Sequence, residues 1–154
     1  REEILSAVTA VIPAIEIVGC RFEGGFEQLG AMQLVADMTA HSAFVRGQPT
    51  RVWEDMDLRL HPVVLRKNNR TVAEGTGANV LGDPIAVLEW TANHLSRMGE
   101  PILSGEVVIT GTCTGLIQAS PGDQFVADFG ELGVVDVSLV REDKSLVYLL
   151  ELGR

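Results

Sequence analysis

The chain has 154 residues, of which 46% are hydrophobic, with a formal net charge of −9 and a pI near 4.7. This size and apolar content are those of one folded domain, and an acidic surface without a basic stripe excludes nucleic acid and anionic membranes as partners. No apolar run is long enough to span a bilayer, and the charged residues 1–3 are unlike a signal peptide, so we expect a cytoplasmic protein. The two cysteines, Cys20 and Cys113, lack Cys-x-x-Cys spacing and agree with a reducing compartment.

The N-terminal residues predict a helix followed at once by a strand. Apolar residues recur at helical spacing from Ile4 to Ile12, Pro13 ends the helix, and Ala14 to Val18 read as the strand. Glu16 has apolar neighbours on both sides, and a carboxylate is costly to bury without a positive partner. From the residues alone, Glu16 either faces water or pairs with Arg21, or it binds a metal ion.

The next segment predicts a loop and then a helix. Glycines are frequent just after Phe22, and a mixed helical pattern runs from Met32 to Phe44. His41 is as well explained by packing or surface exposure as by function, because the histidines never occur at metal-ligand spacing.

After Asp55 the apolar residues change from helical spacing to alternation with polar residues, which predicts a β-hairpin. The first strand contains Leu58 to Leu65, the turn is Asn68-Asn69, and the second strand is Thr71 to Glu74. Asp55 and Asp57 are two residues apart, which would suit a metal ion, but a charged lead-in to a strand explains them better.

The clearest element is a helix from Asp83 to Met98. Asp83 is a preferred N-cap and Pro84 suits the first helical position, while Gly99 suits the left-handed position after the end. An apolar stripe on one face predicts that this face is buried; it contains Ile85, Leu88, Ala92 and Leu95.

Beyond this helix the sequence predicts a short buried strand, Val107 to Ile109, which runs into a bend of small and hydroxylated residues from Thr110 to Gly115. Such a bend can offer hydroxyl and N–H groups to an anion, although its threonines are equally well explained by bonds to the loop backbone. Cys113 fits a small buried thiol better than a nucleophile. Further strands are predicted at Gln124 to Phe129 and Val134 to Val140, followed by a polar turn and an apolar run, Leu146 to Leu152.

Taken together, several motifs resemble the 2-keto-4-pentenoate hydratase and 4-oxalocrotonate decarboxylase family of the fumarylacetoacetate hydrolase superfamily. Their order and spacing carry the resemblance, which covers the chain up to about Val140. The motifs are Pro-Ala-Ile-Glu-Ile-Val at 13–18, Gly-x-Gly-x-x-x-Leu-Gly-x-Pro at 75–84, Gly-Glu-Pro at 99–101, Ser-Gly-Glu-Val-Val at 104–108, Thr-Gly-Thr at 110–112, Gly-Asp at 122–123 and Ala-Asp-Phe-Gly-x-Leu-Gly at 127–133.

The resemblance implies a β-rich α+β fold in which a mixed, curved sheet forms a roll or flattened barrel with a few helices outside. It implies a lyase, which is a hydratase or a decarboxylase of 2-oxo-4-pentenoate-type or 4-oxalocrotonate-type acids. In this chemistry Mg²⁺ or Mn²⁺ stabilises the enolate that forms from the substrate. It assigns Glu16 as one of three metal carboxylates, and Thr112, Thr114 and Gly77 to the small 2-oxo acid substrate. Homodimers are usual in the family.

Two departures from the family pattern matter. Met38 replaces the Asn usually found after Val-Ala-Asp at 35–37, and no Glu-x-Glu pair, which supplies the other two metal ligands, occurs in the chain; the family's catalytic lysine would also precede it. We therefore expect residues 1–154 to be a single, N-terminally shortened catalytic domain, with the general acid and base unassigned. The alternative is a non-catalytic relative that serves as a small-acid-binding or assembly module.

Overall fold

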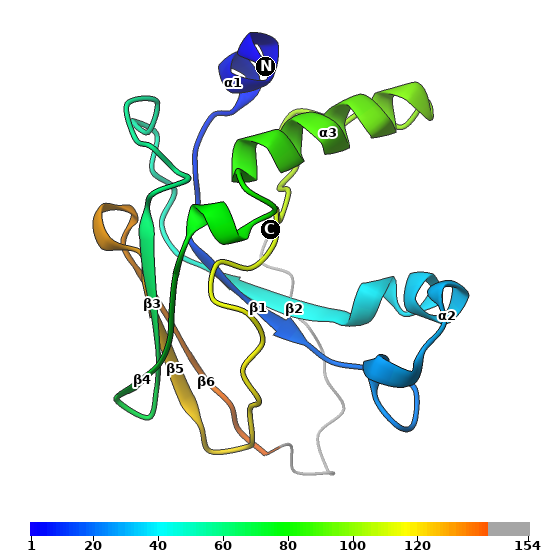
Figure 1. The fold of residues 1–154 in the computed structure, drawn as a ribbon, viewed down its shortest axis with the longest axis vertical. Coiled ribbons are helices and arrows are strands. Elements are labelled where there is room, and N and C mark those ends of the chain that lie inside the picture. The colour runs from blue at the N-terminus through cyan, green and yellow to red at the C-terminus, as the bar shows by residue number, and fades with distance from the viewer. Residues whose placement is uncertain (142–154) are drawn as a thin grey trace.

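The computed structural model describes residues 1–141, and the predicted apolar run at 146–152 lies outside them. Antiparallel strands dominate, with three α-helices and four short 3₁₀ segments in the part described (Figure 1). The elements are α1 Glu2–Ala7, β1 Ala14–Val18, η1 Phe26–Gln28, α2 Ala31–Ala36, η2 Met38–Ala40, β2 His41–Arg46, β3 Pro62–Lys67, β4 Arg70–Thr76, η3 Gly77–Asn79, α3 Pro84–Arg97, β5 Gln124–Asp128, η4 Gly130–Leu132 and β6 Val134–Ser138.

The strands form two sheets. One has four strands in the order β4-β3-β5-β6, and the other is the two-stranded ribbon β1-β2, which lies against β6. The expected β-rich α+β class is confirmed, but every strand pairing in residues 1–141 is antiparallel, so the expectation of a mixed sheet is wrong there. In this part of the chain the sheets do not close into a barrel.

The predicted hairpin is confirmed as β3 and β4. Asn68 and Asn69 both have positive φ, 50° and 64°, as the tight turn between twisted strands requires. The first strand begins only at Pro62, so Leu58 and Leu60 precede it; a proline is tolerated at the first residue of an inner strand.

Helix α3 is also confirmed, including both ends. The Asp83 carboxylate accepts a 2.8 Å hydrogen bond from the N–H of Ile85, and Gly99 has a φ of 82°. The N–H groups of Gly99 and Glu100 bond to the carbonyls of Ser96 and Leu95, which closes the helix with a Schellman motif. The expected burial is wrong for most of the stripe, because Ile85 alone is fully buried and the other members are half-buried.

Three segments differ from the prediction. Helix α1 ends at Ala7, because the β-branched residues that follow favour extended backbone and Val11 pairs with Thr50 instead. Residues 41–44, predicted as the end of a helix, belong to β2, because the residues before them have positive φ and β1 offers a pairing edge. Residues 107–109 are not a buried strand: no strand pairs with them in the described chain, and Val107 and Ile109 are exposed.

The core lies between the four-stranded sheet and the ribbon. Leu65, Phe125 and Ala127 are buried together, and Ile15 of β1 packs against them. Residues 101–120 run from the end of α3 past the ribbon as one long irregular segment (Figure 1). Among the described helices, none has the length and apolar character needed to cross a membrane.

Candidate functional site

A cavity of about 760 Å³ lies between β1, the inner strands of the large sheet and the irregular segment that follows α3. Most of its wall is apolar, and polar groups come from a few separate segments. All four predicted site residues line it: Glu16 from β1, Gly77 from η3, and Thr112 and Thr114 from the bend. Residues almost a hundred positions apart in sequence therefore line one cavity.

Internal hydrogen bonds shape the threonine-rich bend. The Thr112 hydroxyl accepts from the N–H of Gly115 at 2.9 Å and from the N–H of Thr114 at 3.3 Å. This is the structural role that the sequence left open for these threonines. A carboxylate bound through the Thr112 hydroxyl would take the O–H that now donates to the Gly115 carbonyl at 3.3 Å, whereas the Thr114 side chain makes no hydrogen bond within residues 1–141.

The bend is fixed to the end of β4 by its central carbonyl. Asn79 donates a hydrogen bond of 2.7 Å from its side-chain amide to the carbonyl oxygen of Cys113. Gly75 packs against the same carbonyl so closely that an added Cβ would overlap the oxygen. Gly77 has an equivalent contact with the Leu58 carbonyl, so backbone packing requires the absence of a side chain at both glycines.

Glu16 has a partner that the sequence did not identify. Its Oε1 atom lies 2.7 Å from Nδ1 of His41, and both side chains are about one-third exposed. The alternative of a pair with Arg21 is wrong, because the Arg21 guanidinium binds Asp37 at 2.9 Å and the His41 carbonyl at 2.9 Å. His41 is thus a contact of the candidate site.

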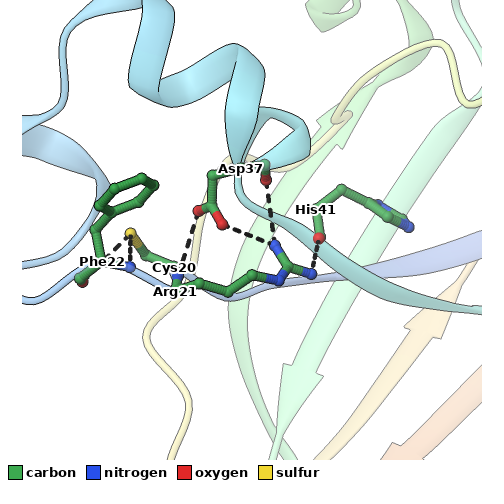
Figure 2. Close-up of polar contacts among 5 residues, drawn as sticks. All are labelled: Cys20, Arg21, Phe22, Asp37 and His41. Carbon is green, nitrogen blue, oxygen red and sulfur yellow. Dashed lines mark hydrogen bonds and ion pairs between the residues drawn. The ribbon is translucent and has the colours of Figure 1, made fainter.

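Asp37 is the most buried charged side chain in the described chain, and Figure 2 shows its contacts with Arg21. The Arg21 guanidinium that bonds to it, together with the Arg21 N–H, holds the pKa of this carboxyl below its usual value despite burial. The signal for this position in the sequence is Val-Ala-Asp at 35–37, but Met38 departs there from the family pattern.

The remaining sequence candidates have structural roles. Burial raises the pKa of the Cys113 thiol, which favours the neutral, unreactive form over a nucleophile, although the residue is half-buried and not fully buried as predicted. The Asp57 carboxylate accepts from the N–H groups of Arg59 and Leu60 in a turn, which supports the reading of a polar lead-in.

Comparison with known proteins gives one consistent answer. A 4-oxalocrotonate decarboxylase of Pseudomonas putida is 33% identical over 138 residues, which is 90% of this chain, and a 2-keto-4-pentenoate hydratase of Paraburkholderia xenovorans is 32% identical over 134 residues, which is 87%. The structure of the decarboxylase from P. putida G7, complexed with magnesium and adipate, superposes with a TM-score of 0.83 over 90% of this chain. No family model matches the chain.

The chain is homologous to the 2-keto-4-pentenoate hydratase and 4-oxalocrotonate decarboxylase family. This confirms the resemblance read from the motifs. The chain spans about half the length of these relatives: 52% of the decarboxylase and 49% of the hydratase.

The donor set of the described residues does not fit a divalent ion of this family by itself. Within residues 1–141, no group of three or more His, Cys, Asp or Glu side chains is placed to hold a metal. Glu16 and Glu27 are the cavity's carboxylates in this range, and one oxygen of Glu16 already bonds to His41. Mg²⁺ needs near-octahedral oxygen ligation, so residues beyond those described would have to complete the site.

Proposed function

We propose that this chain forms the substrate-cavity part of a metal-dependent lyase, a hydratase or decarboxylase of 2-oxo-4-pentenoate-type or 4-oxalocrotonate-type acids. The observation that carries the proposal is that Glu16, Gly77, Thr112 and Thr114 line one cavity. The homology to enzymes named for these reactions, over about half of their length, supports it.

The substrate proposal depends on what the cavity can offer a carboxylate. Arg46 carries the one permanent positive charge among the described lining residues, and it forms no ion pair within residues 1–141. In the antiparallel ribbon Arg46 pairs with Ala14, so its side chain lies on the same face as Glu16. We assign Arg46 to a substrate carboxylate, with the Thr114 hydroxyl and the backbone at Gly77 as further contacts.

The finer architecture belongs to the same proposal. We infer that the two sheets are parts of a curved roll whose remaining wall corresponds to the half of the relatives that this chain does not match. The half-buried face of α3 and the exposed apolar residues at 107–109 are surfaces that such a wall would cover. A homodimer in the cytoplasm remains our prediction for the assembled enzyme.

The alternative of a non-catalytic small-acid-binding module is kept for one reason. The described residues contain no cluster able to hold the metal that the reaction needs. The coding sequence upstream of Arg1 bears directly on this: a Glu-x-Glu strand encoded there favours the enzyme.

Binding and turnover measurements separate these hypotheses. The chain is titrated calorimetrically with adipate, with and without Mg²⁺, and is assayed for Mg²⁺-dependent turnover of 2-hydroxypenta-2,4-dienoate. Turnover supports the lyase and eliminates the module. Adipate binding without turnover agrees with both hypotheses, which the coding sequence upstream of Arg1 then separates, and no acid binding under either condition contradicts both.

A further inference from the structure

We infer that His41 is a positioning residue that holds the Glu16 carboxylate in one orientation, and that Arg21 and Asp37 in turn hold His41. The functional meaning of this arrangement rests on the proposed role of the cavity, since Glu16 lines it. The arrangement itself rests on four contacts and on the register of the β1-β2 ribbon.

The first step is an irregularity in strand pairing. Ile17 pairs with Ala43 but Val18 pairs with His41, so β2 contains one extra residue, Ser42, at this point. A shift of one residue reverses the side of the sheet to which a side chain points. In a regular ladder Ser42 would lie opposite Val18; the bulge brings His41 onto the face that carries Glu16.

The second step is the direct contact. Nδ1 of His41 lies 2.7 Å from Oε1 of Glu16, and because an ionised carboxylate can only accept, the histidine N–H donates. This bond occupies one oxygen of Glu16 and leaves the other for a ligand in the cavity.

The third step is the support behind His41, which Figure 2 shows as a chain of contacts. Arg21 uses one end of its guanidinium for the Asp37 carboxylate at 2.9 Å and carbonyl at 3.2 Å, and the other for the His41 carbonyl at 2.9 Å. The Asp37 side chain is 1% exposed, so this anchor is buried. Arg21 thereby connects the end of α2 to the first residue of β2.

The backbone between these anchors needs such support. Met38, Thr39 and Ala40 all have positive φ, at 50°, 55° and 60°, a conformation that costs energy for residues with a Cβ. The Ala40 carbonyl accepts from the N–H of Gly19 at 2.8 Å, which fastens the turn to the end of β1. Without the Arg21 bonds, this turn would relax and His41 would leave Glu16.

The experiment compares Arg21→Met with Arg66→Met, which removes a similar arginine from an exposed pair with Asp128 at 3.3 Å. Side-chain NMR at fixed pH follows the His41 ring nitrogens and the Glu16 carboxyl carbon. We expect loss of the hydrogen-bonded Nδ1–H signal and a shifted Glu16 carbon in Arg21→Met, with both signals unchanged in Arg66→Met. Wild-type signals in a folded Arg21→Met protein would overturn the inference.

Substitutions of His41 give a second, independent comparison. His41→Asn keeps an N–H donor near the position of Nδ1, whereas His41→Ala removes it. We expect the Glu16 carbon signal to stay near its wild-type position in the first and to move in the second; an equal response to both contradicts the positioning role. If Arg21→Met does not fold, Arg21→Lys replaces it in the test. Lysine keeps a positive charge beside Asp37 but lacks the guanidinium, which bonds to Asp37 and to the His41 carbonyl at the same time.

These readouts do not depend on ligand or activity. Failure of the adipate titration with the expected NMR result would remove the proposed function and leave the His41 arrangement intact. If the wild-type chain binds adipate but the Arg21 and His41 variants keep wild-type NMR signals, the positioning role of His41 is removed and the proposed function stands.

Discussion

The side-chain amide of Asn79 donates a 2.7 Å hydrogen bond to the carbonyl oxygen of Cys113, across 34 positions of sequence. This bond joins the segment after β4 to the centre of the threonine-rich bend, on the cavity wall. The conformation of the bend is thus held by the Asn79 side chain as well as by the hydrogen bonds of Thr112 within the bend.

Removing this bond should loosen the bend. Asn79→Ala leaves the Cys113 carbonyl without its donor, so we expect a loss of about 1 kcal/mol in the free energy of unfolding and weaker adipate binding. Urea unfolding and calorimetry measure the two effects. Asn93→Ala, which removes a bond from an exposed amide to the Glu89 carbonyl on α3, is the control and should leave binding unchanged.

Gly75 should not tolerate a side chain. A Cβ at this position would overlap the Cys113 carbonyl, so Gly75→Ala must displace the bend or β4, at a cost of about 2 kcal/mol. Gly30→Ala is the control, because φ there is −75° and the nearest atom to an added Cβ is 3.5 Å away. Equal melting temperatures for the two variants would refute the close approach.

The N-cap of α3 should make a measurable contribution to stability. Asp83 accepts from the N–H of Ile85 at 2.8 Å and binds Arg1 at 2.6 Å. We expect Asp83→Ala to lower the free energy of unfolding by about 1 kcal/mol. Asp83→Ser, which retains a capping oxygen, should recover part of this loss in the same denaturant experiment; no recovery would assign the effect to Arg1.

Acid should destabilise the protein through Asp123. Lys67 and Asn68 donate to this carboxylate and hold its pKa below the ordinary value. A carboxyl with a lowered pKa in the folded state adds stability above its unfolded pKa, near 3.9, and that stability is lost as pH falls through the folded value. Asp123→Asn should therefore be less stable than wild type at pH 7, with the difference shrinking towards pH 2 in thermal unfolding. A constant difference would contradict this assignment.

Arg46 gives a test of ligand chemistry. Replacement of its guanidinium by the thioether in Arg46→Met should weaken adipate binding by about tenfold, or about 1.4 kcal/mol. Arg70→Met, at the exposed start of β4 and away from the cavity, should bind adipate as wild type does. Equal affinities for both variants would remove Arg46 from the proposed site.

The features that could be predicted from sequence are those encoded locally. Asp83, Pro84 and Gly99 mark the ends of α3 by their own backbone preferences, and Asn68-Asn69 marks the hairpin turn in the same way. A family motif placed Glu16 on the cavity wall. Each of these signals is contained in a few neighbouring residues.

The failures all depend on partners distant in sequence. Residues 41–44 carry a helical pattern, but β1 offers a pairing edge, and their strand is visible only in the register of β1 and β2. The Glu16–His41 contact depends on the bulge in β2, and no pattern in the neighbouring sequence predicts that bulge. Val107 to Ile109 have the composition of a buried strand, yet a strand needs a partner, and the described chain provides none.

We expect the exposed apolar side chains of the irregular segment after α3 to affect the solubility of the protein. Val107, Ile109 and Leu116 are 47%, 38% and 63% exposed, and mutual repulsion from nine excess negative charges keeps such surfaces apart at neutral pH. Acidification towards the isoelectric point, 4.7, removes this repulsion, whereas the apolar side chains stay exposed. We therefore expect the protein to precipitate in mildly acidic buffers and to redissolve when the pH is returned to 8.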